Sequence, residues 1–151
     1  MRKIIIAMLL IFVVTPPAQA FLGMFDSVET VTAKDGVITL DTSTLSTGEA
    51  KHYQYKENSA VIRFFVVKDS GGIIRAALDA CEVCWRENKG YKQQKGAMLC
   101  VSCGQRFALN RIGLIRGGCN PHPIAFTTRG EALTVTSDEL TTGLGYFPGG
   151  K

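Results

Sequence analysis

Two cysteine-containing stretches decide how the rest of the sequence is interpreted: Cys81-Glu82-Val83-Cys84 and Cys100-Val101-Ser102-Cys103-Gly104. Two Cys-x-x-Cys pairs at this separation are typical of a zinc-ribbon or rubredoxin-like knuckle pair, in which four thiolates form one tetrahedral metal site. Gly104 permits the left-handed backbone that turns amide groups toward a thiolate. The spacing therefore predicts that Cys81, Cys84, Cys100 and Cys103 bind a metal or a metal-containing cofactor.

Other uses of paired cysteines fit this sequence less well. Two disulfide bonds would suit an oxidising compartment, and they remain the alternative. A thioredoxin-like site requires a helix at the first pair, and no amphipathic helix is predicted after Cys84. Covalent haem attachment requires a histidine directly after the pair, where this sequence has Trp85 and Gly104.

The cysteines do not identify the metal, because zinc, a single iron ion, an iron–sulfur cluster and cuprous copper all accept thiolate ligands. Zinc would make the site structural, whereas iron would allow electron transfer. The loop Gly117-Gly118-Cys119-Asn120-Pro121-His122-Pro123 offers two more candidate metal ligands. Cys119, with His122, would supply a fifth ligand, a second metal site or a capture point. The alternative is a buried thiol and a surface histidine.

Residues 1–20 have the pattern of a secretory signal peptide. Arg2 and Lys3 are basic, residues 4–14 are apolar, and Ala18-Gln19-Ala20 is a small-residue cleavage site. We expect cleavage after Ala20 and a periplasmic or otherwise exported mature chain without a membrane span. A retained N-terminal anchor is the alternative.

Composition places residues 21–151 in a single metal-binding domain that is long enough to have its own hydrophobic core. The formal net charge is +4 without a basic run, which argues against nucleic acid as a partner. No Ser-His-Asp arrangement, paired-carboxylate motif or phosphate-binding loop is recognisable in the sequence. Classical enzyme chemistry is therefore not favoured.

Short strands account for most of the remaining sequence. The strand candidates are residues 37–40, 51–55, 61–68 and 73–78. The last two form a hairpin through the turn Asp69-Ser70-Gly71-Gly72 and lead directly to Cys81. Residues 85–99 predict a second short hairpin between the cysteine pairs. We expect a mainly β fold, a small barrel or sandwich of about six to eight short strands with the knuckle pair at one end.

Residues 37–48 and 132–143 resemble each other and align without a gap. Each contains an alternating apolar strand, a Ser/Thr/Asp cluster able to cap a short turn, a Leu and a closing Gly. We expect two similar strand-turn units, each packing one strand and one Leu into the same core.

Several motifs, taken in order, resemble the FtrD-like domain. They are Arg63-Phe64-Phe65-Val66-Val67-Lys68, Ala76-Ala77-Leu78-Asp79-Ala80-Cys81-Glu82-Val83-Cys84, Gly90-Tyr91, Cys100-Val101-Ser102-Cys103-Gly104 and Gly117-Gly118-Cys119-Asn120-Pro121. That family is described as membrane iron–sulfur proteins associated with bacterial iron transport. The resemblance implies that Cys81, Cys84, Cys100 and Cys103 are cofactor ligands. It also implies components of a membrane iron-transport system as partners.

Two functional hypotheses follow. The first is an exported metal-binding protein that holds an iron–sulfur cluster or mononuclear iron, serves electron transfer or metal handling, and is linked to iron uptake. The second is a non-catalytic binding module in which a structural zinc site fixes a loop platform for a protein partner.

Overall fold

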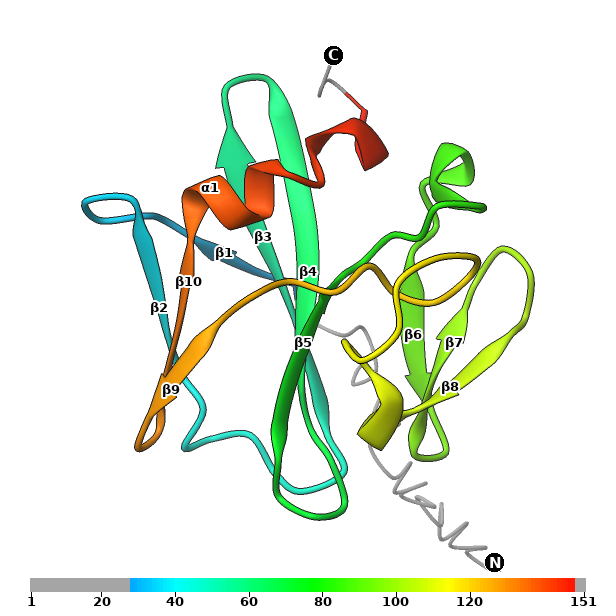
Figure 1. The fold of residues 1–151 in the computed structure, drawn as a ribbon, viewed down its shortest axis with the longest axis horizontal. Helices are drawn as coiled ribbons and strands as arrows, with labels where there is room; N and C mark the ends of the chain where they lie inside the picture. Colours follow the sequence, from blue (N-terminus) through cyan, green and yellow to red (C-terminus); the bar gives the residue numbers. More distant parts are fainter. Residues whose placement is uncertain (1–27, 149–151) are drawn as a thin grey trace, which may run out of the picture.

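Three small β-sheets lie side by side in the structure (Figure 1). The computed structural model of the protein describes residues 28–148, and the expected signal segment over residues 1–20 lies outside them. The first sheet has the order β1 (Glu29–Val31), β3 (Ala50–Glu57), β4 (Ala60–Lys68) and β5 (Ile74–Leu78). The second sheet has the order β2 (Val37–Asp41), β10 (Ala132–Thr136) and β9 (Thr127–Arg129). The third sheet has the order β6 (Tyr91–Gln94), β7 (Ala97–Cys100) and β8 (Arg106–Ala108).

Strand β4 is the centre of the fold because both of its faces are buried. Its sequence is rich in the β-branched and aromatic residues that favour strands. Phe64 and Val66 point into one hydrophobic core, whereas Phe65 and Val67 point into another, and all four are 0% exposed. Successive side chains of a strand alternate between its two faces. The alternation makes the first sheet the middle layer of a sandwich.

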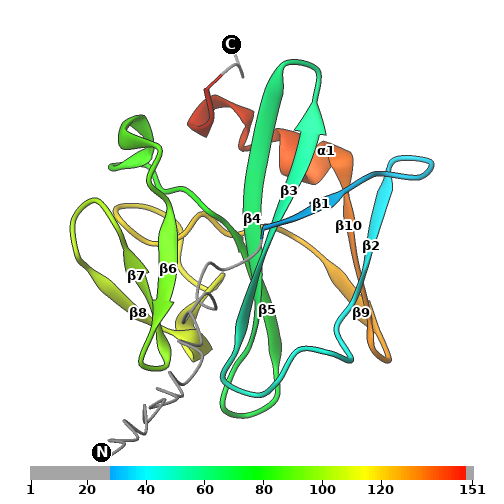
Figure 2. The same ribbon diagram turned by 180° about the vertical axis from the view of Figure 1, so that it is seen from behind.

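The first core lies between the first and second sheets. Ile38 and Leu40 from β2 and Leu133 and Val135 from β10 pack there against the β4 face that carries Phe64. The short helix α1 (Ser137–Thr141) follows β10 directly and closes one end of this core, as Figure 2 shows from behind.

The pairing of β2 with β10 explains the similarity between residues 37–48 and 132–143. The two strands are antiparallel, and Thr39 lies opposite Thr134, its equivalent in the sequence alignment. A local two-fold axis therefore passes between these two threonines and relates the two strands. Leu45 and Leu140, the leucines of the two units, both belong to the first core, as expected from the sequence.

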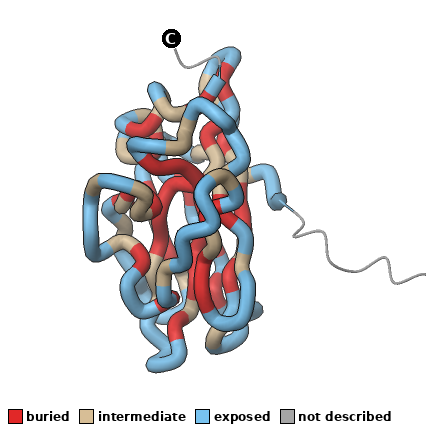
Figure 3. The backbone as a smooth tube through the Cα atoms, turned by 90° about the vertical axis from the view of Figure 1, so that its right-hand side faces the viewer, coloured by how far each residue is buried: buried red, intermediate tan, exposed pale blue. Residues whose placement is uncertain are grey.

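The second core lies on the other face of the first sheet and contains part of the cysteine cluster. Phe65 and Val67 pack there against Tyr91 and Met98 of the third sheet, together with Cys81 and Cys100. Figure 3 shows that the buried segments run through the interior while the connecting loops are mostly exposed. Two cysteines are therefore fixed by the packing of the sandwich itself.

The mainly β, sandwich-like architecture predicted from the sequence is confirmed. The strand candidates correspond closely to β2, β3, β4 and β5, and the predicted turn after β4 is closed by the Gly72 N–H donating to the Asp69 carbonyl at 2.9 Å. The sheets do not close into a barrel within the described residues. The strand number differs, since ten strands are present there and three of them, β1, β8 and β9, have only three residues each. Such short strands show no recognisable alternation in the sequence.

Candidate metal centre

The first cysteine pair forms a turn shortly after β5. Leu78, the last residue of β5, is 0% exposed, so the turn begins near a fixed point of the central sheet. The backbone N–H of Cys84 donates a hydrogen bond to Cys81 Sγ at 3.2 Å, and such a bond stabilises a thiolate. A single 3₁₀ turn over Trp85–Glu87 follows Cys84, so the first pair does not begin an α-helix.

The second cysteine pair forms the turn between β7 and β8. The Gly104 N–H donates to the Cys100 carbonyl at 2.9 Å, and the Cys100 N–H donates to the Gln105 carbonyl at 2.9 Å. Gly104 has a φ of +76°, the left-handed conformation predicted from the sequence. The knuckle pair of the predicted fold class is therefore present.

The hairpin predicted between the two pairs is also present. Strands β6 and β7 are antiparallel, with Tyr91 opposite Cys100. The Val101 N–H donates to the Gly90 carbonyl at 3.0 Å and extends this pairing toward the second knuckle. The hairpin returns the chain to the first knuckle.

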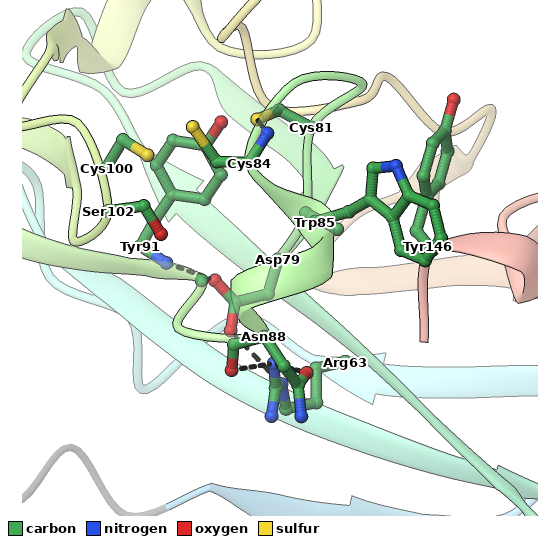
Figure 4. A pocket seen from close by; sticks show the side chains of 12 residues that line it. Arg63, Asp79, Cys81, Cys84, Trp85, Asn88, Tyr91, Cys100, Ser102 and Tyr146 are labelled. Atoms are coloured by element: carbon green, nitrogen blue, oxygen red, sulfur yellow. Dashed lines mark hydrogen bonds and ion pairs between the residues drawn. The ribbon is translucent and has the colours of Figure 1, made fainter. Parts of the chain in front are cut away.

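The five cysteine sulfurs form two overlapping groups of three. The sulfurs of Cys81, Cys84 and Cys100 all lie within 4.8 Å of one another, and those of Cys84, Cys103 and Cys119 do the same. We call these groups the inner and the outer sulfur set, because Cys81 and Cys100 are buried whereas Cys103 is exposed. Cys84 belongs to both sets, and its Sγ lies 4.0 Å from Cys119 Sγ. Figure 4 shows the three inner cysteines beside the ring of Tyr91.

The donor set fits a thiolate-bound metal. Metal–sulfur bonds of about 2.3 Å at tetrahedral angles place neighbouring sulfurs about 3.8 Å apart. The sulfurs of each set lie within 4.8 Å of one another, and those of Cys84 and Cys119 are 4.0 Å apart. Both knuckles contribute to the inner set, while Cys103 groups with Cys119 rather than with Cys81 and Cys100. The metal-binding role of the five cysteines stays a prediction. The structure adds that their sulfurs lie close together: Cys81, Cys84 and Cys100 in one set, and Cys84, Cys103 and Cys119 in the other.

The cysteine thiols differ in acidity, and the difference does not follow the division into two sets. Burial raises the pKa of the Cys84, Cys100 and Cys119 thiols. A hydrogen bond from the backbone N–H of Gln105 lowers the pKa of the exposed Cys103 thiol. Of these four thiols, Cys103 is the most readily deprotonated, and a metal bound by Cys84, Cys100 or Cys119 would have to displace the thiol proton.

His122 lies outside both sulfur sets. Its Nε2 is 2.9 Å from an Arg116 guanidinium nitrogen, and its ring packs against Tyr146 at a centroid distance of 5.1 Å. Its backbone N–H donates to Ala80 at 3.0 Å, and its carbonyl accepts from Leu78 at 2.8 Å. Burial, reinforced by the Arg116 charge, lowers the pKa of His122. The side chain is buried rather than at the surface, and its backbone ties the Cys119 loop to the end of β5.

Asp79 is a site residue to which the sequence analysis gave no role. Its carboxylate accepts a hydrogen bond from the Tyr91 N–H at 2.6 Å and lies 3.5 Å from Arg63 Nε (Figure 4). Burial raises its pKa to about 7, while the Tyr91 N–H and Arg63 act in the opposite direction. Arg63 also donates to Asn88 Oδ1 at 2.6 Å. Only the position of Asp79, just before the first knuckle, distinguishes it in the sequence.

A family model for the membrane iron-sulfur containing protein FtrD-like matches residues 45–147. The chain belongs to this family. The matched region contains all five cysteines. It also contains β4 and β5, whose side chains contribute to both hydrophobic cores. The FtrD-like assignment confirms the resemblance found in the sequence, and together with the cysteine cluster it indicates metal binding. No curated protein and no solved structure gives a match to the chain.

Within residues 28–148, no helix has the length and apolar character needed to cross a membrane.

Proposed function

We propose that this FtrD-like chain is an exported iron-binding protein that transfers electrons or handles metal for a membrane iron-transport system. The observation that carries the proposal is the convergence of five thiols at the boundary between the second core and solvent. A site buried on one side and exposed on the other suits a centre that must be held rigidly and still be reached by a partner. The family description favours iron over other metals that bind thiolates.

The chain's own residues would perform distinct tasks at this centre. Cys81 and Cys100 are anchored by the second core, so they would hold the metal group in a fixed position. The Cys84 N–H that donates to Cys81 Sγ would stabilise the negative charge of that thiolate in every state of the centre. An iron ion or iron–sulfur cluster supplies one-electron redox chemistry, and hydrogen bonds to sulfur together with solvent exposure set its potential.

Anaerobic purification of the full chain tests the iron assignment. We expect stoichiometric iron and an absorption spectrum that changes on addition of dithionite. Cys100→Ser should lose the iron, since it removes an anchored ligand. A colourless protein that contains only zinc, with a spectrum that does not respond to reductant, would overturn the proposal.

The same measurements address a second candidate, a non-catalytic binding module with a structural zinc site. The burial of Cys81 and Cys100 in the second core favours it, since a closed zinc site would brace that core. Tightly bound zinc, with stability that depends on it, would support this candidate.

Export is tested separately by expressing the chain with residues 1–20 and fractionating the cells. We expect the protein in the periplasmic fraction, with a mass that corresponds to a first residue of Phe21. A protein of full mass in the membrane fraction would instead support a retained anchor.

A further inference from the structure

The position of Cys84 distinguishes this centre from an ordinary four-cysteine site. Ligands of one tetrahedral metal must all lie close to one another, with sulfurs about 3.8 Å apart. The sulfurs form two overlapping sets of three, in each of which they lie within 4.8 Å of one another, and Cys84 is the member common to both. The four cysteines of the two knuckles are divided between the sets, because Cys103 groups with Cys119.

We propose that Cys84 bridges two metal ions, one bound by the inner sulfur set and the other by the outer sulfur set. The inner ion would be held by Cys81, Cys84 and Cys100, and the outer ion by Cys84, Cys103 and Cys119. A thiolate sulfur has enough lone pairs to bind two cations at once. The inference rests on the proposed function, since it requires that these thiols bind metal, and it adds the number of ions and the atom that joins them.

Charge supports two ions over one. Four thiolates around one divalent ion carry two negative charges in excess, whereas five thiolates around two divalent ions carry only one. A smaller net charge is less costly beside an apolar core, and Cys81 and Cys100 lie in such a core. All five cysteines are free thiols in the structure, so each is available as a ligand.

The two ions would differ in how easily they exchange. The inner set contains two buried cysteines, while the outer set contains the exposed Cys103 and the half-buried Cys119. Three sulfurs leave one position open on a four-coordinate ion, and at the outer ion this position would face solvent. The outer ion should therefore be lost first to a chelator, and the shared Cys84 provides a direct path between the two positions.

Cadmium provides a redox-inert test of the two-ion centre. The full chain, reduced and kept anaerobic, is titrated with ¹¹³Cd²⁺ and studied by ¹¹³Cd NMR. We expect two ions per chain and two resonances that are scalar-coupled through the Cys84 sulfur. Limiting EDTA should remove one ion before the other. One ion per chain, with a stoichiometry unchanged in Cys119→Ser, would overturn the inference.

Variants separate the two positions. Cys119→Ser and Cys81→Ser should each retain one ion and lose the coupling, and EDTA should remove the remaining ion faster from Cys81→Ser. Cys84→Ser should weaken both positions at least tenfold. Ser102→Ala, inside the second knuckle but without a thiol, is the matched control and should keep two coupled ions. Circular dichroism of each variant checks that it is folded, and a variant that has lost the parent spectrum is not counted.

The outcomes also separate this inference from the proposed function. Two coupled cadmium ions in a chain that purifies without iron would support the bridged centre and contradict the iron assignment. A single cadmium ion in a chain that purifies with iron would do the reverse. Absence of cadmium binding in the folded chain would contradict both.

Discussion

The phenolic hydroxyl of Tyr91 donates a hydrogen bond to the backbone carbonyl oxygen of Cys119 at 2.6 Å. Tyr91 also lies opposite Cys100 in the pairing of β6 with β7. Its ring is buried and packs against Phe65 and Phe107, each at a centroid distance of 6.0 Å. One side chain therefore links the second core, the second knuckle and the loop that carries Cys119.

Tyr91→Phe removes this hydrogen bond and keeps the packing of the ring. We expect a loss of about 1 kcal/mol in the free energy of unfolding, the usual net value of one hydrogen bond. The Cys119 loop should also release its metal sooner. Urea denaturation measures the first effect and the rate of cadmium loss to EDTA the second. Tyr146→Phe leaves the Tyr91–Cys119 bond intact and should release metal at the parent rate; equal rates in both variants would argue against the link.

Gly90 and Gly96 form a matched pair in the stretch between the knuckles. Both have left-handed backbones, with φ of +63° and +70°. A Cβ on Gly90 would lie 2.5 Å from Asp79 Oδ1, whereas a Cβ on Gly96 would have no neighbour within 4 Å. Gly96→Ala should cost about 1–2 kcal/mol through backbone strain alone.

Gly90→Ala should cost clearly more than Gly96→Ala, because it also displaces the Asp79 carboxylate from the Tyr91 N–H. Thermal or urea unfolding of the two variants gives the comparison. An equal loss of stability in both variants would show that the Asp79 carboxylate can move without cost and that its hydrogen bond to the Tyr91 N–H does not stabilise the start of β6.

Phe64 and Phe65 test whether the two cores have separate functions. Both side chains are 0% exposed, but Phe64 lies in the first core and Phe65 lies in the second core with Cys81 and Cys100. Replacement of either by Leu should lower stability by about 1 kcal/mol, a typical cost for a core substitution. Only Phe65→Leu should also weaken metal binding. Competition for cadmium against a chromophoric chelator measures the affinity, and equal affinity in both variants would contradict the separation.

Asp69 controls a pH-dependent part of the stability at the turn between β4 and β5. Burial would raise its pKa, but the Ile73 N–H, Arg75 and the Gly71 N–H outweigh burial, and the pKa is lowered. A carboxyl group with a lowered pKa stabilises the fold above its unfolded-state pKa, and this contribution is lost as pH falls through the folded-state pKa.

Asp69→Asn should therefore be less stable than the parent chain near pH 7, and the difference should shrink as pH falls below about 4. Urea denaturation of both metal-free, reduced chains across this range gives the measurement. A difference that is independent of pH would show that the carboxylate charge is not what stabilises the turn.

The local elements could be predicted from the sequence because each has a local signal. Residues 61–68 combine β-branched and aromatic side chains, and their pattern alone predicts β4. The Cys-x-x-Cys spacing predicts both knuckles, and Gly104 marks the left-handed turn of the second knuckle. The family resemblance was also recognisable from the order of these motifs.

The grouping of the sulfurs could not be predicted because it depends on contacts between distant segments. Cys119 reaches Cys84 because the chain returns past β5, where Pro123 forms an isolated bridge with Ala77 and the His122 N–H bonds to Ala80. No short-range pattern encodes that return. The contact between Asp79 and Tyr91 is likewise a result of how β5 and β6 are placed.

The pairing of β2 with β10 imposes an order on folding. The hairpins β4–β5 and β6–β7 join neighbours in the sequence and can form early, whereas the Thr39–Thr134 pair spans most of the chain. Contacts between such distant segments carry a larger loop-closure cost and form late. Both cysteine knuckles precede β10 in the chain, and neither of their turns depends on the pairing of β2 with β10. Strands β2 and β10 contribute no residue to the second core, so the metal centre can form while the first core is still incomplete.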